Sequence, residues 1–198
     1  MSEPRTLLQL AGVDPVPAPL SSSVLVIVDA QREYVDGALP LPGVAPALAV
    51  IARLIARARE ADTPIVHVVH RGRSGGLFDP DGNGGRVADE AAALAGETIV
   101  GKSLPNAFAG TELDSVLKAT GRQSIVLAGF MTHMCISSTA RAATDLGLRV
   151  TLAADGSATR DLPDPLGGVI KADDLHRAAL AALSDRFATI VAADTIPA

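Results

Sequence analysis

The sequence predicts an α/β fold built around a six-stranded, mainly parallel sheet. Short aliphatic runs, typical of strands covered on both faces, alternate along the chain with stretches of helical periodicity. The chain has 198 residues without an internal repeat or linker, which suits one domain with a substantial core. Strands that alternate with helices form parallel sheets through right-handed crossovers, so the alternation decides the fold class.

An N-terminal arm is expected over residues 1–23, because prolines are spaced through it; they are Pro4, Pro15, Pro17 and Pro19. The domain is expected over residues 24–198. It opens with an unbroken aliphatic strand at residues 24–28, which is followed directly by Asp29. An amphipathic helix is predicted over residues 44–61, where apolar residues recur at helical spacing.

The remaining strands are expected at residues 65–69, 98–100, 125–128, 148–153 and 187–192. Helices are expected at residues 86–94, from a capping-box-like start at Thr111 to Ala119, after Gly129, and at residues 173–183. Two polar stretches rich in Gly or Pro, residues 72–85 and 155–171, are predicted to be long loops that form the walls of a pocket.

Composition excludes several classes of partner. The formal net charge of −5 argues against nucleic acid or an anionic membrane as the main partner. No apolar stretch reaches the length of a membrane span, and the first twenty residues lack the apolar region of a secretory signal. A cytoplasmic location is therefore expected. Cys135 is the only cysteine, so no disulfide can form within the chain.

Three chemically active side chains follow strands of the predicted sheet: Asp29, Lys102 and Cys135. Because parallel strands end at one edge, these side chains are expected to share a crevice near a switch in strand order. Cys135 is expected in the first turn of the helix after Gly129, where the helix start and the nearby lysine would lower the pKa of its thiol. Alternative interpretations are a small buried hydrophobe, or a redox-sensing thiol that lacks a resolving cysteine.

Residues 26–31, 101–113 and 129–143 carry a resemblance to a known family. They read Val-Ile-Val-Asp-Ala-Gln, Gly-Lys-Ser-Leu-Pro-Asn-Ala-Phe-Ala-Gly-Thr-Glu-Leu and Gly-Phe-Met-Thr-His-Met-Cys-Ile-Ser-Ser-Thr-Ala-Arg-Ala-Ala, and they resemble the isochorismatase-like cysteine hydrolases. The resemblance implies a three-layer sandwich with a Rossmann-like sheet, a catalytic triad of Asp29, Lys102 and Cys135, and a homo-oligomer. It also implies a cis peptide bond between Phe130 and Met131, which would direct the Met131 amide toward an oxyanion hole shared with the Cys135 amide.

The sequence differs from two groups within this family, and each difference narrows the range of reactions that we expect. Nicotinamidases of this family carry a metal-binding Asp-x-His motif, whereas the corresponding region here reads His67-Val-Val-His70 without that aspartate. Residues three apart on a strand point to opposite faces, so the two histidines are poorly placed to share an ion. No metal or cofactor is therefore expected. True isochorismatases need no cysteine nucleophile, so Cys135 favours covalent catalysis on a carbonyl carbon.

Candidate substrate-binding residues are Gln31, Tyr34, Phe108 and His133, with Phe78, Asn106 and Arg160 as further pocket residues. Alternatives stay open for three of them. Gln31 either orients Asp29 or caps a turn, and Phe108 is either a pocket aromatic or an ordinary core residue. His133 either binds substrate or faces solvent.

The function predicted from the sequence is hydrolysis of a C–N bond in a small amide, lactam or urea through a thioester on Cys135. The nearest alternative is hydrolysis of an isochorismate-like ether, which depends on Asp29 and not on Cys135. A binding protein without catalytic activity is the alternative from another class, because fold alone does not establish function.

Overall fold

A computed structural model describes residues 3–198 and contains a parallel sheet of six strands in the order β3-β2-β1-β4-β5-β8. The strands are β1 (Val24–Val28), β2 (Ile65–His70), β3 (Thr98–Lys102), β4 (Ser124–Phe130), β5 (Arg149–Ala158) and β8 (Thr189–Val191). Every adjacent pair is parallel, so the predicted fold class is confirmed. The strand order switches direction between β1 and β4, where open α/β sheets bind their ligands.

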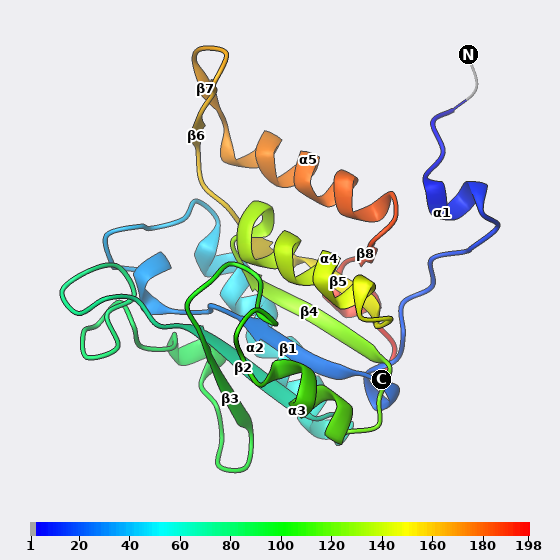
Figure 1. Ribbon diagram of the computed structural model, residues 1–198, viewed down its shortest axis with the longest axis horizontal. Helices are drawn as coiled ribbons and strands as arrows, with labels where there is room; N and C mark the ends of the chain where they lie inside the picture. The colour runs from blue at the N-terminus through cyan, green and yellow to red at the C-terminus, as the bar shows by residue number, and fades with distance from the viewer. Residues whose placement is uncertain (1–2) are drawn as a thin grey trace.

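Helices cover both faces of the sheet, which gives three layers (Figure 1). The main helices are α2 (Val44–Glu60), α3 (Leu113–Ala119), α4 (Ser137–Asp145) and α5 (Ala172–Ser184). Helix α2 lies behind the sheet in Figure 1, and α3, α4 and α5 lie in front of it. No helix of residues 3–198 combines the length and apolarity that a membrane span requires.

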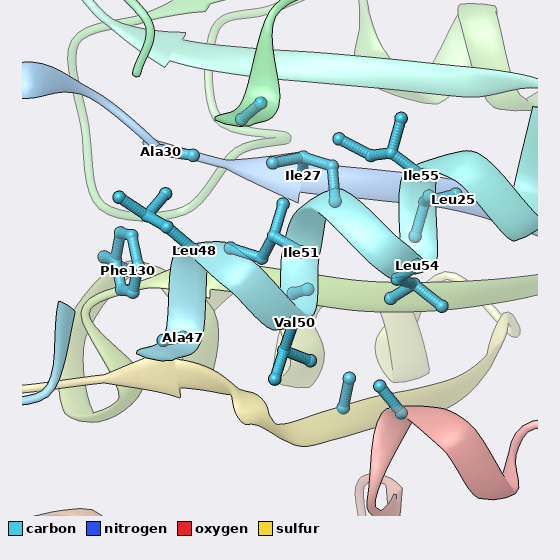
Figure 2. Close-up of a cluster of buried hydrophobic side chains, with 14 of the residues drawn as sticks. Leu25, Ile27, Ala30, Ala47, Leu48, Val50, Ile51, Leu54, Ile55 and Phe130 are labelled. Carbon is cyan, nitrogen blue, oxygen red and sulfur yellow. The ribbon is translucent and has the colours of Figure 1, made fainter. Parts of the chain in front are cut away.

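The core is divided by β1, whose side chains alternate between the two layers. Leu25 and Ile27 belong to the cluster under α2, whereas Val24, Val26 and Val28 belong to the cluster under α3 and α4. Figure 2 shows how the apolar stripe of α2 meets the first cluster; the labelled α2 residues are Ala47, Leu48, Val50, Ile51, Leu54 and Ile55. With every β1 residue buried, the first strand fixes the position of Asp29 directly behind it.

The prediction of one continuous loop over residues 155–171 is wrong, because parts of this segment form strands. Strand β5 continues to Ala158, and Leu162–Pro163 pairs with Val169–Ile170 as the hairpin β6–β7, which projects from the body (Figure 1). Tertiary hydrogen bonds explain the difference, because Asp155 accepts from the Ala193 amide and Ser157 donates to the Gly129 carbonyl, each at 2.8 Å. Local sequence contains no sign of either partner.

Two helices also begin at residues other than those predicted from the sequence. Thr111 accepts from the Leu113 amide and donates to the Ala107 carbonyl, so α3 begins at Leu113 without a capping box. Between β4 and α4 lies a π-helical turn, Thr132–Ile136, so Cys135 precedes the α-helix and is not in its first turn. Of the helix expected over residues 86–94, only a short 3₁₀ turn is present, at Asp89–Ala91.

The N-terminal segment is partly attached to the domain. It contains a short helix, α1 (Leu7–Leu10), and a 3₁₀ turn, Leu20–Ser22. The Leu8 amide donates to the Asp185 carbonyl at 3.1 Å, and the Leu20 side chain is fully buried in the core. The boundary of the domain at residue 24 stays a prediction.

Gly129 allows the close approach of β1 and β4. Its φ is +122°, and a Cβ there would lie 2.0 Å from the Val28 carbonyl oxygen. We therefore expect Gly129→Ala to lower the free energy of unfolding by more than about 3 kcal/mol, measured by urea denaturation. Gly147 is a matched control, because it also has a positive φ, +81°, but a Cβ added there would meet no atom within 4 Å. Gly147→Ala should cost only about 1–2 kcal/mol. Equal losses in the two variants would contradict this account.

Candidate active site

The structure brings Asp29, Lys102 and Cys135 together at the carboxyl edge of the sheet. Asp29 directly follows β1, Lys102 is the last residue of β3, and Cys135 lies in the turn after β4. The Lys102 ammonium is 2.7 Å from Oδ2 of Asp29 and donates to Sγ of Cys135 at 3.3 Å. All three residues are buried, with 0%, 2% and 5% of their surfaces exposed. The lysine thus links the acid to the thiol.

The electrostatic environment differs from the one expected from the sequence. Burial raises the pKa of Asp29 against the opposing influence of Lys102. Burial, followed by the charge of Asp29, raises the pKa of Cys135 to about 12, and Lys102 only partly opposes them. The expectation of a lowered thiol pKa is therefore wrong for the unliganded protein. Cys135 is a thiol at neutral pH, and its deprotonation requires a base.

A neutral histidine and a glutamine hold the lysine in place. Nζ of Lys102 lies 3.2 Å from Nδ1 of His70, whose pKa is lowered by burial and by Lys102. Gln31 binds the His70 backbone twice, since its Oε1 accepts from the amide at 2.8 Å and its Nε2 donates to the carbonyl at 3.0 Å. Nε2 also donates to the Gly85 carbonyl. Gln31 is fully buried, and its side-chain amide binds the His70 backbone, whereas only its backbone amide donates to Asp29, at the carbonyl, at 2.8 Å.

Two aromatic side chains predicted to contact substrate, Tyr34 and Phe108, pack in different core clusters. Tyr34 packs edge-on against Phe78 and Phe130, at centroid distances of 5.1 and 5.8 Å, and is 2% exposed. Phe108 is half-buried and packs against the core cluster that contains Cys135. Tyr34 and Phe108 thus belong to the core clusters on opposite faces of the sheet, and the cluster against which Phe108 packs contains Cys135.

Glu33 is a buried side chain that sequence reasoning missed. Its Oε1 accepts from the Ala38 amide at 2.7 Å and its Oε2 from the Phe78 amide at 3.3 Å. A Cβ at Gly84 would lie 2.0 Å from that Oε2, so the loop passes close to the carboxylate. Glu33 fixes the 72–85 loop and Phe78 within it. The one available signal was a charged residue shortly after the end of a buried strand.

The turn that carries Cys135 is held by hydroxyl groups. Thr132 Oγ1 lies 2.8 Å from both Ser157 Oγ and His176 Nδ1, so it joins β5 and α5 to the turn. His133 is half-buried, and its Nδ1 pairs with Oγ1 of Thr159. Its Nε2 has no such partner among residues 3–198 and stays available to a substrate.

The peptide bond between Phe130 and Met131 is cis, as the resemblance implies. Met131 is 7% exposed and begins the turn that leads to Cys135. Its carbonyl accepts from the amides of Met134 and Ile136, whereas its own amide donates to no acceptor among residues 3–198. A free amide at the start of the turn that carries Cys135 is the kind of donor that an oxyanion hole requires.

His67 and His70 contact different side chains. Nε2 of His67 lies 2.8 Å from Oε2 of Glu97, which also binds Arg59, whereas His70 faces Lys102. Glu97 has a pKa lowered to about 2, chiefly by Arg59. Across residues 3–198, no group of three or more His, Cys, Asp or Glu side chains is arranged to hold a metal ion.

The raised thiol pKa predicts how Cys135 reacts with iodoacetamide. Because the pKa is about 12, the alkylation rate should rise about tenfold per pH unit between pH 7 and 10 without a plateau. Asp29→Asn removes a charge that raises this pKa and should speed alkylation at fixed pH. Lys102→Met removes a charge that lowers it and should slow alkylation. Cys135→Ala, which leaves no thiol, is the control. A plateau below pH 8.5 in the parent protein would contradict the prediction.

Comparison with known proteins identifies the family of the chain. The family model described as the Isochorismatase domain matches residues 23–195. A secreted isochorismatase effector of Verticillium dahliae is 38% identical over 197 residues, which cover 99% of this chain and 100% of the relative. A streptothricin hydrolase of Streptomyces noursei is 33% identical over 175 residues, covering 87% of this chain and 63% of the relative. The crystal structure of an isochorismatase from Pseudomonas putida superposes with a TM-score of 0.94 at 42% identity, covering 98% of this chain and 100% of that one. The chain belongs to the isochorismatase family of hydrolases.

Proposed function

We propose that this protein is a cysteine hydrolase that cleaves a C–N bond of a small amide, lactam or urea. The observation that carries the proposal is the buried contact of Lys102 with both Asp29 and Cys135. Relatives named streptothricin hydrolase, ureidoacrylate amidohydrolase and maleamate amidohydrolase support an amide substrate. Catalytic roles for Asp29, Lys102 and Cys135 are part of the proposal.

In the first half of the proposed reaction, Sγ of Cys135 attacks the carbonyl carbon while Asp29 accepts the thiol proton. Transfer to the adjacent carboxylate avoids a free buried thiolate, which the raised pKa of Cys135 makes costly. The amides of Met131 and Cys135 stabilise the negative oxygen. Asp29 then gives its proton to the departing nitrogen, so the C–N bond breaks and a thioester remains.

In the second half, Asp29 takes a proton from water, whose oxygen attacks the thioester carbon. Collapse of this intermediate breaks the C–S bond, and the proton returns to the sulfur. Lys102 stays protonated and interacts with whichever partner carries the negative charge, Asp29 or the sulfur. No cofactor takes part in these steps.

Hydrolysis of an isochorismate-like ether is the second candidate, favoured by the 38% identity to a protein named an isochorismatase effector. This reaction protonates a substrate through Asp29 and needs no nucleophilic sulfur. The buried lysine-to-sulfur contact supports the first candidate, because it gives Cys135 an electrostatic partner that an inert core thiol would lack.

Two variants separate the candidates. On an amide identified by screening for ammonia release, Cys135→Ala should lower kcat by about 10⁴-fold or more, because the nucleophile is lost. Asp29→Asn should lower kcat by about 10²- to 10⁴-fold through loss of proton transfer. On isochorismate, substantial turnover by Cys135→Ala together with none by Asp29→Asn would favour the ether reaction. Near-normal amide turnover by Asp29→Asn would refute its assigned role.

We make three further proposals, which concern the type of ligand, the oligomeric state and the location of the protein. The protein acts on a small molecule and not on nucleic acid or a membrane, it works as a homo-oligomer, and it resides in the cytoplasm. The Verticillium relative is named a secreted effector, so a cytoplasmic location does not extend to every relative. Among substrate contacts, Tyr34, Phe108 and His133 remain candidates, whereas Gln31 acts through His70.

A further inference from the structure

Three side chains form a chain of hydrogen bonds at the π-helical turn after β4. Thr132 and Ser157 are buried, and half-buried His176 comes from α5. Oγ1 of Thr132 lies 2.8 Å from Oγ of Ser157 and 2.8 Å from Nδ1 of His176. It also lies 3.1 Å from the Ala158 carbonyl oxygen. Because Oγ of Ser157 lies 2.8 Å from the Gly129 carbonyl oxygen, the chain leads from α5 through the turn to β4.

The number of hydroxyl protons fixes the direction of these bonds. A carbonyl oxygen only accepts, so Ser157 gives its single proton to Gly129. Thr132 then shares its own proton between Oγ of Ser157 and the Ala158 carbonyl. No Thr132 proton remains for His176, so Nδ1 of the imidazole is the donor in that contact. The opposite tautomer would leave the short contact between the two hydroxyl oxygens without a proton.

The Ser157 hydroxyl holds both ends of the segment 129–132. It donates to the Gly129 carbonyl at one end and accepts from the Thr132 hydroxyl at the other. Met131 lies between them, and its amide, the proposed oxyanion donor, donates to no acceptor among residues 3–198. Since no hydrogen bond of its own directs this amide, its direction depends on how firmly the two ends are held.

The bond from His176 acts on the orientation of Thr132, whose proton already has two acceptors. A threonine hydroxyl rotates to suit its partners, but a donor on the α5 side turns its proton toward β5. Hydrogen bonds in series also polarise and strengthen one another. His176 therefore strengthens the bonds that run from Thr132 through Ser157 to β4.

We propose that His176 is a positioning residue for the oxyanion hole, because its Nδ1–H orients the hydroxyl chain that holds the Met131 amide toward the substrate oxygen. This inference rests on the proposed amide hydrolysis and adds to it a residue of α5 that acts through Thr132 and Ser157. The negative oxygen develops only in the transition state. Loss of the His176 donor should therefore lower kcat and leave KM nearly unchanged.

The kinetic test uses the amide identified by the screen for ammonia release. His176→Leu removes the donor and should lower kcat by about 10-fold, less than the loss of about 10²- to 10³-fold for a direct oxyanion donor, with KM within about twofold. His176→Asn places an amide N–H close to the position of Nδ1 and should recover most of kcat. Ser157→Ala breaks the chain at its next bond and should cause a similar loss. The double variant His176→Leu/Ser157→Ala should be little worse than either single variant.

Leu180→Ala is the control for altered packing of α5, because Leu180 lies one turn beyond His176 and packs against the core. It should lower the free energy of unfolding in urea and leave kcat and KM unchanged. Unchanged kcat in His176→Leu, equal losses in His176→Leu and Leu180→Ala, or a loss that His176→Asn does not recover would overturn the positioning role and leave the amidase reaction standing. Absence of amide turnover in the parent protein would overturn both.

The tautomer of His176 gives a second test, which does not depend on turnover. Burial lowers the pKa of His176 against the charge of Asp173, so above pH 7 the ring is neutral and carries one proton. In ¹⁵N NMR spectra of protein labelled in its histidine rings, the resonances missing from His176→Asn belong to His176. We expect them to show the proton on Nδ1 in the parent protein. A proton on Nε2 would reverse the bond to Thr132 and overturn the inference.

Discussion

The buried ion pair between Lys102 and Asp29 is the constraint on which the rest of the site depends. Removing two charges from water is costly, and only close contact and further hydrogen bonds compensate for it. Here the ammonium meets a carboxylate, an imidazole nitrogen and a sulfur at 2.7, 3.2 and 3.3 Å. These partners come from β1, β2 and the turn after β4, and the lysine itself ends β3. The parallel register of the sheet is therefore what makes the ion pair possible.

The same burial changes how the thiol is activated. An exposed cysteine beside a lysine would have a lowered pKa, but here burial and Asp29 outweigh Lys102 and keep the proton on Cys135. In the proposed reaction the proton leaves only when a carbonyl carbon accepts the sulfur. Such a site reacts poorly with general electrophiles, because the nucleophile forms only with a substrate that also engages the oxyanion donors.

The strands and the proximity of Asp29, Lys102 and Cys135 could be predicted because their signals are local. Aliphatic runs mark buried parallel strands, and a polar residue at each strand end marks the common edge. The extension of β5, the start of α3 and the role of Gln31 could not be predicted, because they depend on partners distant in the sequence. Gln31 binds the backbone of His70 and Gly85, and Ser157 binds Gly129. The raised pKa of Cys135 likewise follows from burial, which the motif alone does not specify.

In the proposed reaction, chemistry and specificity have different structural origins. Asp29 and Lys102 lie at the ends of strands and Cys135 lies in the turn after β4, whereas we expect the walls of the substrate pocket to come from the 72–85 loop and the segment after β5. Glu33 and Gln31 attach that loop through backbone groups, so the side chains of its exposed residues can vary, although Gly72, Gly84 and Gly85 leave no room for a Cβ. Relatives with the same strand-end residues can therefore carry different walls and act on different substrates.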